Sequence, residues 1–154
     1  MNQIKQFLII LFTFSSILSC NSTKKSTNND MFSANPNSEL TETYWKLTEL
    51  MGAPVVMETG TKTEMHMILK KQDNQVLGNG GCNSFRGSYT LLEGNRLGFS
   101  QLVGTKMACI NMEKELTFME VLQKADNYSI QGKILSINKG RMAPLAKFEA
   151  VYMK

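Results

Sequence analysis

The sequence has little of the residues from which catalytic centres and metal sites are usually built. It contains one histidine, His66, and three cysteines in 154 residues. A Ser-His-Asp or Cys-His arrangement would have to use His66, and no nucleophile-elbow pattern accompanies it. One histidine does not complete a four-ligand zinc set with unpaired cysteines, and the C-x-x-C pattern of redox proteins is absent. We therefore expect no catalytic residue, no metal and no cofactor.

Long apolar runs and a strong charge imbalance are also lacking. The longest apolar run, Phe7–Phe14, is too short to span a bilayer comfortably as a helix. The 17 basic residues exceed the 13 acidic residues only slightly, which gives a formal net charge of +4. This mildly basic balance indicates no polyanionic partner, so we expect no nucleic acid.

The first residues have the features of an export signal. Lys5 precedes the apolar run, and small residues follow it, which predicts a signal peptide over residues 1–19. The segment ends in "ILSC", which resembles the lipobox of bacterial lipoproteins although Ile17 stands where leucine is usual. This resemblance implies lipidation of Cys20 by acyl chains such as palmitate. An ordinary secretory signal followed by a chance cysteine is the alternative.

A polar segment follows the predicted lipidation site. Residues 20–41 are dominated by Ser, Thr, Asn and Lys, and such a composition buries too little apolar surface to offset its ordering entropy. We predict a disordered tether there and a single folded domain over residues 42–154. A diacylglyceryl group on Cys20 would hold this domain at a membrane without a spanning helix, because two acyl chains give stable anchoring.

The predicted domain contains short alternating segments separated by turn residues, with one helical segment between them. Strands are predicted within residues 44–50, 64–70, 76–81, 86–92, 96–104, 127–131, 133–138 and 146–153. The connections are too short for parallel crossovers, so the pattern predicts an α+β fold with a mainly antiparallel sheet.

The helical segment covers residues 111–125, which contain neither Gly nor Pro. Asn111 is its predicted N-cap. Three apolar residues recur at helical spacing and are expected to face the core: Leu116, Met119 and Leu122. Three acidic residues are expected to be solvent-facing charges that favour the helix N-terminal half: Glu113, Glu115 and Glu120.

A glycine-rich stretch, "GNGGCNSFRGSY" (residues 78–89), raises the question of phosphate binding. A dinucleotide loop would need glycine where Asn83 stands, and a strand rather than a helix follows. The P-loop ending Gly-Lys-Ser/Thr is absent as well. We interpret Gly80 and Gly81 as positions of positive φ or close backbone approach, and Asn83 as tolerant of the left-handed region. A ligand approaching the exposed backbone is the alternative.

Two stretches together resemble a known family. "GGCNSFRGSYTL" followed by "GTKMACINMEKELTFMEVL" resembles the META domain of the HslJ-like family, and the similarity extends from Trp45 to "KFEAVYM". The residues that match the motif are Gly80, Gly81, Cys82, Asn83, Gly87, Tyr89, Thr105, Met107 and Cys109. The resemblance implies an antiparallel sheet curled into an incomplete barrel with one principal helix packed against it.

The resemblance also bears on the two remaining cysteines. Cys82 and Cys109 both belong to the motif and would lie near one another, in a domain expected outside the cytoplasm, where disulfides persist. A disulfide between them is one interpretation, and two buried free thiols are the other.

The sequence "MHM" (residues 65–67) suggests a copper site because thioether ligands suit Cu(I). On a strand, however, Met65 and Met67 point to one face and His66 to the other, so the three cannot share one ion. We expect the methionines to pack in the core and the imidazole to be exposed or hydrogen-bonded.

Together these observations predict a lipoprotein of the bacterial cell envelope, anchored through Cys20 and facing the periplasm or the surface, with the outer membrane favoured. The family resemblance implies no established enzymatic activity and links such domains to envelope or heat stress tolerance, drug tolerance, and secretion or motility. We expect a non-enzymatic accessory role with an unidentified envelope protein as partner. The alternative is a small-ligand-binding lipoprotein that uses the interior or mouth of the curled sheet.

Overall fold

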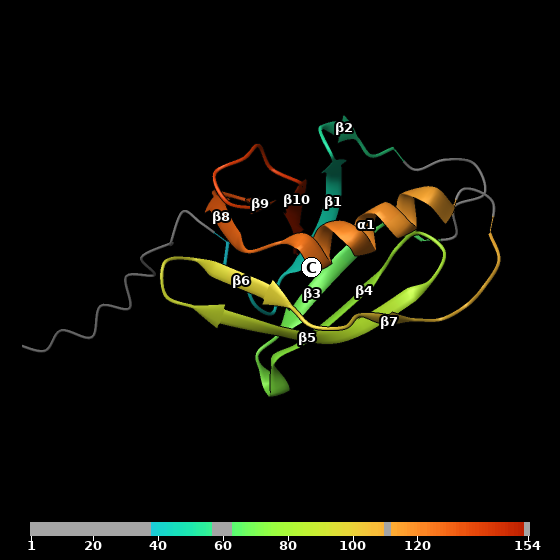
Figure 1. The fold of residues 1–154 in the computed structure, drawn as a ribbon, viewed down its shortest axis with the longest axis horizontal. Coiled ribbons are helices and arrows are strands. Elements are labelled where there is room, and N and C mark those ends of the chain that lie inside the picture. Colours follow the sequence, from blue (N-terminus) through green and yellow to red (C-terminus); the bar gives the residue numbers. More distant parts are fainter. Residues whose placement is uncertain (1–37, 57–62, 110–111, 153–154) are drawn as a thin grey trace, which may run out of the picture. The chain divides into compact units, whose positions relative to one another are not determined.

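The computed structural model describes residues 38–56, 63–109 and 112–152 (Figure 1), and these belong to one compact unit that spans residues 34–154. The predicted signal peptide, Cys20, most of the predicted tether and the predicted N-cap Asn111 lie outside the described residues. Within the described ranges, no helix is both long enough and apolar enough to cross a bilayer.

Ten strands and one α-helix make up the described structure. The strands are β1 (Tyr44–Leu50), β2 (Ala53–Pro54), β3 (His66–Lys70), β4 (Gln75–Asn79), β5 (Ser84–Leu92), β6 (Arg96–Phe99), β7 (Val103–Gly104), β8 (Asn127–Gln131), β9 (Ile134–Asn138) and β10 (Ala146–Val151). The helix α1 covers Met112–Lys124, and a short 3-10 helix, η1 (Gln72–Asn74), joins β3 to β4. The α+β prediction is confirmed, and the predicted strand over residues 96–104 is divided into β6 and β7.

The strands form a sheet whose pairing order returns to its start. All named pairs are antiparallel, and the order β10-β9-β8-β6-β5-β4-β3-β1 is closed by pairing of β1 with β10. The closure is weakest between β6 and β8, which share the single register pair Arg96 and Asn127. The predicted curled, incomplete barrel with one helix is therefore confirmed, with β2 and β7 as short additional strands.

The core lies inside this ring and is filled by large apolar side chains. The largest fully buried ones are Trp45, Phe118, Phe148, Met67, Leu69, Leu97, Leu122, Leu135, Ile137 and Val76. Phe118 of α1 meets Phe85 of β5 edge-on at 5.6 Å between ring centroids and Phe148 of β10 at 5.9 Å. The helix thus packs its aromatic residue between opposite parts of the sheet, and in Figure 1 α1 crosses in front of β3 and β4.

The buried face of the helix agrees with the predicted one only in part: Leu122 is buried as predicted and Met119 is partly buried against the core, but Leu116 is not buried. Its buried residues are Glu115, Phe118, Val121 and Leu122. Leu116, predicted to face the core, is 63% exposed, whereas Glu115, predicted to face solvent, is 8% exposed. Both expectations were wrong because the helix turns its acidic residue inward to meet polar groups that lie far away in the sequence.

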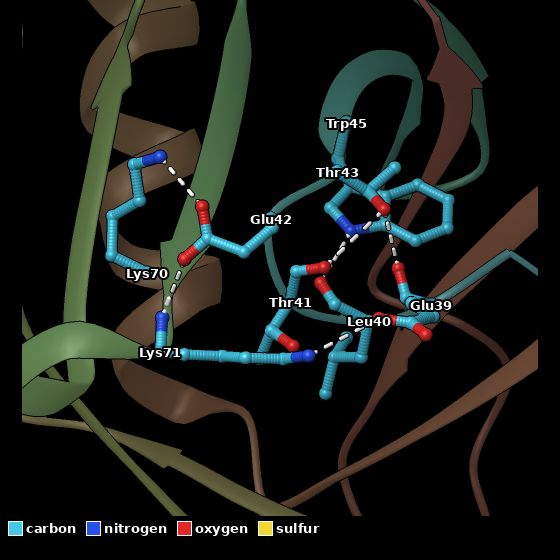
Figure 2. Close-up of polar contacts among 8 residues, drawn as sticks. All are labelled: Glu39, Leu40, Thr41, Glu42, Thr43, Trp45, Lys70 and Lys71. Carbon is cyan, nitrogen blue, oxygen red and sulfur yellow. Dashed lines mark hydrogen bonds and ion pairs between the residues drawn. The ribbon is translucent and has the colours of Figure 1, made fainter.

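The folded structure begins earlier than predicted. Residues 38–41 were assigned to the tether, but Leu40 is buried and its carbonyl accepts a 2.8 Å hydrogen bond from the Trp45 indole (Figure 2). Glu42 has a φ of 58° and accepts 2.7 Å bonds from the Lys70 ammonium and the Lys71 backbone N–H. The Lys70 bond is the main reason that the pKa of Glu42 lies below its ordinary value. These contacts fasten the segment to the end of β3.

Candidate functional site

The turn between β4 and β5, residues 80–83, contains two of the three glycines of the motif, Gly80 and Gly81, and each has a separate structural reason. Gly81 has a φ of 104°, a conformation that side chains disfavour, and its N–H donates to the Asn79 side chain at 2.7 Å. A Cβ on Gly80 would lie 2.5 Å from Cγ of Glu115. Gly81 therefore provides the positive φ, and Gly80 provides the close approach.

Glu115 is the acceptor around which this turn is organised. One carboxylate oxygen accepts from the backbone N–H groups of Cys82 (3.2 Å) and Asn83 (2.8 Å). The other accepts from the Asn83 side-chain amide at 2.8 Å. A carboxylate is suited to this place because it offers only acceptor positions to groups that are all donors.

Asn83 joins the turn to the segment that precedes α1. Its side-chain oxygen accepts from the Thr105 hydroxyl and the Met107 N–H, both at 2.7 Å. Its amide nitrogen donates to the Met107 carbonyl at 3.2 Å as well as to Glu115. These four bonds use the full capacity of the amide. Asn83 is not among the residues with positive φ, so its role is side-chain hydrogen bonding rather than the predicted tolerance of the left-handed region.

The same two segments are linked covalently. The sulfurs of Cys82 and Cys109 form a disulfide, with the Cα atoms 6.2 Å apart. Of the two arrangements left open by the sequence, the structure therefore has the bonded one. We call the turn together with Thr105, Met107, Cys109 and Glu115 the braced turn.

The other two motif residues lie further along β5. A Cβ on Gly87 would lie 2.6 Å from Cδ2 of Leu102, so the segment after β6 crosses β5 closely at this point. Tyr89 is buried and its hydroxyl donates to the Lys70 carbonyl at 3.0 Å, and burial raises the pKa of this phenol. Both residues support packing, and neither joins the braced turn.

His66 and its neighbouring methionines lie on opposite faces of the sheet. Met65 and Met67 are buried, and His66 is half-buried on the outer face, stacked on Tyr44 with 4.4 Å between ring centroids. Nδ1 of His66 donates to the Glu64 carbonyl at 3.0 Å, because a carbonyl can only accept. Among the described residues, no group of three or more His, Cys, Asp or Glu side chains is placed to hold a metal ion.

Glu64 forms a small ionic cluster beside this histidine. Its carboxylate accepts from the Tyr44 hydroxyl at 2.9 Å and pairs with Lys46 at 2.8 Å. The Lys46 bond is the main cause that lowers the pKa of Glu64, while burial is the main cause that raises the pKa of Tyr44. The charge of Glu64 is thus balanced within the cluster.

A groove of about 550 Å³ lies on the outer face of β3, β4, β5 and β7. Its lining residues are His66, Leu77, Gly78, Ser84, Phe85, Arg86, Val103, Gly104 and Thr105. Thr105 belongs both to this lining and to the braced turn, so the two features adjoin. Sequence reasoning did not find the groove, because its residues come from four strands.

The arrangement of the braced turn indicates a structural purpose. Its carboxylate and its amide are hydrogen-bonded within the turn and its two cysteines form a disulfide, so this set of residues contains neither a free thiol nor an unpaired acid. The fold and this turn define a small α+β domain in which a buried polar network joins the one helix to the turn between β4 and β5.

Comparison with known proteins agrees with this description. The model of the META domain family matches residues 38–152, and the chain belongs to that family, which confirms the predicted resemblance. An NMR structure of a protein from Burkholderia xenovorans has a TM-score of 0.60 at 22% sequence identity, covering 74% of this chain and 85% of that one. At this identity the likeness shows the fold alone. A comparison with curated proteins finds no match.

Glu115 is the residue of the braced turn that sequence reasoning missed. A signal for it was present, because Glu115 lies within the second of the two stretches that carry the family resemblance, "GTKMACINMEKELTFMEVL". Acidic residues near a helix N-terminus are favoured by the helix dipole in any case, so position in the helix does not distinguish Glu115 from Glu113.

Proposed function

We propose that this protein is a lipid-anchored component of the bacterial cell envelope whose META domain has an accessory role without catalysis. The observation that carries the proposal is the braced turn, in which the motif residues hydrogen-bond and cross-link one another. Motif residues that bond to one another in this way support a structural role for the motif rather than a catalytic one. A disulfide in a domain of this size is also typical of proteins that work outside the reducing cytoplasm.

Anchoring is supported by the sequence that precedes the domain. The "ILSC" segment supplies a lipidation site at Cys20, and the folded structure is already in place at Ser38, whose N–H donates to the Gly132 carbonyl at 2.8 Å. The intervening residues would link the domain to acyl chains in the membrane. The family's association with envelope or heat stress tolerance supplies the proposed context.

Intact-mass measurement of the protein purified from its own membranes tests the anchor. We expect a chain that begins at Cys20 and carries acyl chains. Cys20→Ser should abolish the lipid mass and release the protein from the membrane fraction, whereas Asn21→Ala, a change one residue away, should alter neither. An unmodified Cys20 in the wild-type protein would refute the anchor.

Crosslinking in the native envelope tests the accessory role. The anchored protein should recover one envelope polypeptide in stoichiometric amount, and the Cys20→Ser protein should recover much less because it is no longer held beside that partner. A strain that lacks the protein should survive heat or envelope damage less well and be rescued by the wild-type chain. Recovery of no polypeptide from the anchored form would refute a protein partner.

A further inference from the structure

Most side chains that line the groove belong to two neighbouring rows of register partners, and Ile68 and Asn79 belong to these rows without lining the groove. In the first row, successive register partners are Ile68, Leu77, Arg86 and Val103. In the second row they are His66, Asn79 and Ser84, followed by Thr105, whose N–H donates to the Ser84 carbonyl at 3.0 Å. Between the rows run the register partners Gly78, Phe85 and Gly104. Because side chains alternate between the faces of a strand, these three present their backbone to the groove.

The first row therefore forms an apolar wall of the groove that contains one cationic side chain, Arg86. Arg86 is exposed and lies between its direct partners Leu77 and Val103, and Val103 is 56% exposed. Among the residues described, Arg86 has neither an ion pair nor a side-chain hydrogen bond. A guanidinium in such a setting matches a carboxylate, which it can bind through two parallel N–H bonds.

The opposite wall offers hydrogen-bonding groups. The Ser84 hydroxyl accepts from the Asn79 amide at 3.3 Å, which leaves its own proton free to donate. The Nδ1 proton of His66 is engaged with the Glu64 carbonyl, so its Nε2 is the remaining polar atom. The hydroxyl proton of Thr105 is donated to Asn83.

The charge along the groove favours an anion. Among the described residues that line it, Arg86 and His66 are the titratable ones and none is acidic. Glu64, two residues before His66 in the sequence, forms an ion pair with Lys46 and accepts a hydrogen bond from the Tyr44 hydroxyl. The volume of about 550 Å³ lies within the range of small-molecule sites.

We propose that this groove binds a small amphipathic carboxylate, with the carboxylate on Arg86 and the apolar portion against Leu77 and Val103. The proposal concerns the outer face of the sheet rather than its filled interior. It is independent of the anchor and of any protein partner, so the two proposals can fail separately.

Titration of the isotopically labelled chain from residue 21 to 154 with octanoate tests the proposal. This chain contains the whole compact unit with its own core, and the disulfide is kept intact. We expect saturable amide shifts concentrated at residues 84–86 and 103–105. The matched probe 1-octanol, which keeps the alkyl chain and lacks the charge, should bind at least about tenfold more weakly, because charge-assisted hydrogen bonds are lost.

Variants then identify the cation. Arg86→Gln should weaken octanoate binding by about tenfold, and Arg86→Lys by less, because it keeps the charge without the planar pair of donors. The control is Arg141→Gln, which removes the same charge from an exposed residue in the connection between β9 and β10 and should leave the affinity unchanged.

Four outcomes would overturn the proposal: no saturable binding, shifts centred elsewhere, equal affinity for octanol, or equal losses in the two arginine-to-glutamine variants. Amide spectra verify that each variant is folded. If Arg86→Gln does not fold, Val103→Asp provides the test, because it places a carboxylate beside Arg86 at an exposed position and should abolish binding.

Discussion

Substitution of Glu115 tests the structural account of the braced turn most directly. Glu115→Ala removes the acceptor of two buried backbone N–H groups and of one side-chain amide proton. A buried donor left without a partner costs about 1–3 kcal/mol. The Asn83 amide nitrogen keeps the Met107 carbonyl, so the two backbone groups dominate the loss. We expect the free energy of unfolding to fall by about 4 kcal/mol, a large share of the total for a small domain.

Glu115→Gln removes the negative charge of the side chain and keeps its size and shape. The new amide can direct its oxygen toward the two backbone N–H groups, but its nitrogen then faces the Asn83 amide nitrogen, which is also a donor. We expect this variant to lose about 2 kcal/mol, less than the alanine variant. The order alanine, glutamine, wild type in rising stability follows from the number of donors that remain satisfied.

Urea unfolding of residues 21–154 measures both losses, and Trp45 is a suitable reporter because it is the single tryptophan and is fully buried. With a slope of about 2 kcal/mol per molar urea, the alanine variant should unfold at a midpoint about 2 M lower. Glu113→Ala, an exposed acid in the same helical turn, is the control and should change stability by less than about 0.5 kcal/mol. If the Glu115 and Glu113 variants unfold alike, the carboxylate does not brace the turn.

Two further predictions concern other parts of the structure. Serine in place of both Cys82 and Cys109 should lower the free energy of unfolding by about 3–4 kcal/mol in the same assay, and an unchanged midpoint would show that the crosslink adds no stability. The hydrogen bond from the Gly140 N–H is the main cause that holds the pKa of Asp126 below its ordinary value of 3.8. Ionised Asp126 therefore stabilises the folded state at pH values above the unfolded-state pKa. This contribution to stability is lost as the pH falls through the folded-state pKa. Asp126→Asn should therefore flatten the dependence of stability on pH below about 4, measured by urea unfolding at several pH values, and an unaltered slope would contradict the assignment.

Local patterns predicted the individual elements well. The strands at residues 44–50 and 127–131 have the predicted bounds, and the helix differs from its predicted range by one residue at each end. In these segments, alternation or helical spacing is strong and turn residues mark the ends, so short-range preferences decide the outcome. The pairing of β1 with β10, by contrast, joins the two ends of the domain, and short-range patterns do not determine it.

The buried face of α1 could not be chosen from the helix alone. Its sequence contains two overlapping apolar sets: the predicted Leu116, Met119 and Leu122, of which Leu122 is buried and Met119 partly buried, and a second set formed by Phe118, Val121 and Leu122. The second set is buried because that rotation also brings Glu115 to the turn between β4 and β5. The partners of this carboxylate are 32 and 33 residues away, so the preference arises from tertiary contacts.

The start of the folded domain was also predicted incorrectly, because residues 38–41 are folded although their composition predicts a tether. The segment before Thr43 is polar in composition, and this composition predicted a tether. Its one buried leucine, Leu40, changes the average hydrophobicity of the segment very little. Glu42 fixes the segment through two hydrogen bonds to residues 70 and 71, and a positive φ at this position turns the chain toward them (Figure 2). Specific polar contacts of this kind leave no periodic signal.

The shape of the groove depends on the braced turn, because the braced turn holds β7 in place. A strand of two residues has too few ladder bonds to hold itself beside β5, and Figure 1 shows β7 at that edge. The Asn83 bonds to Thr105 and Met107 and the disulfide at Cys109 fix the chain immediately after it. Val103 and Thr105 are thereby held as the ends of the two rows. The family motif thus shapes an outer surface, because its bonds hold the chain that follows β7 beside β5.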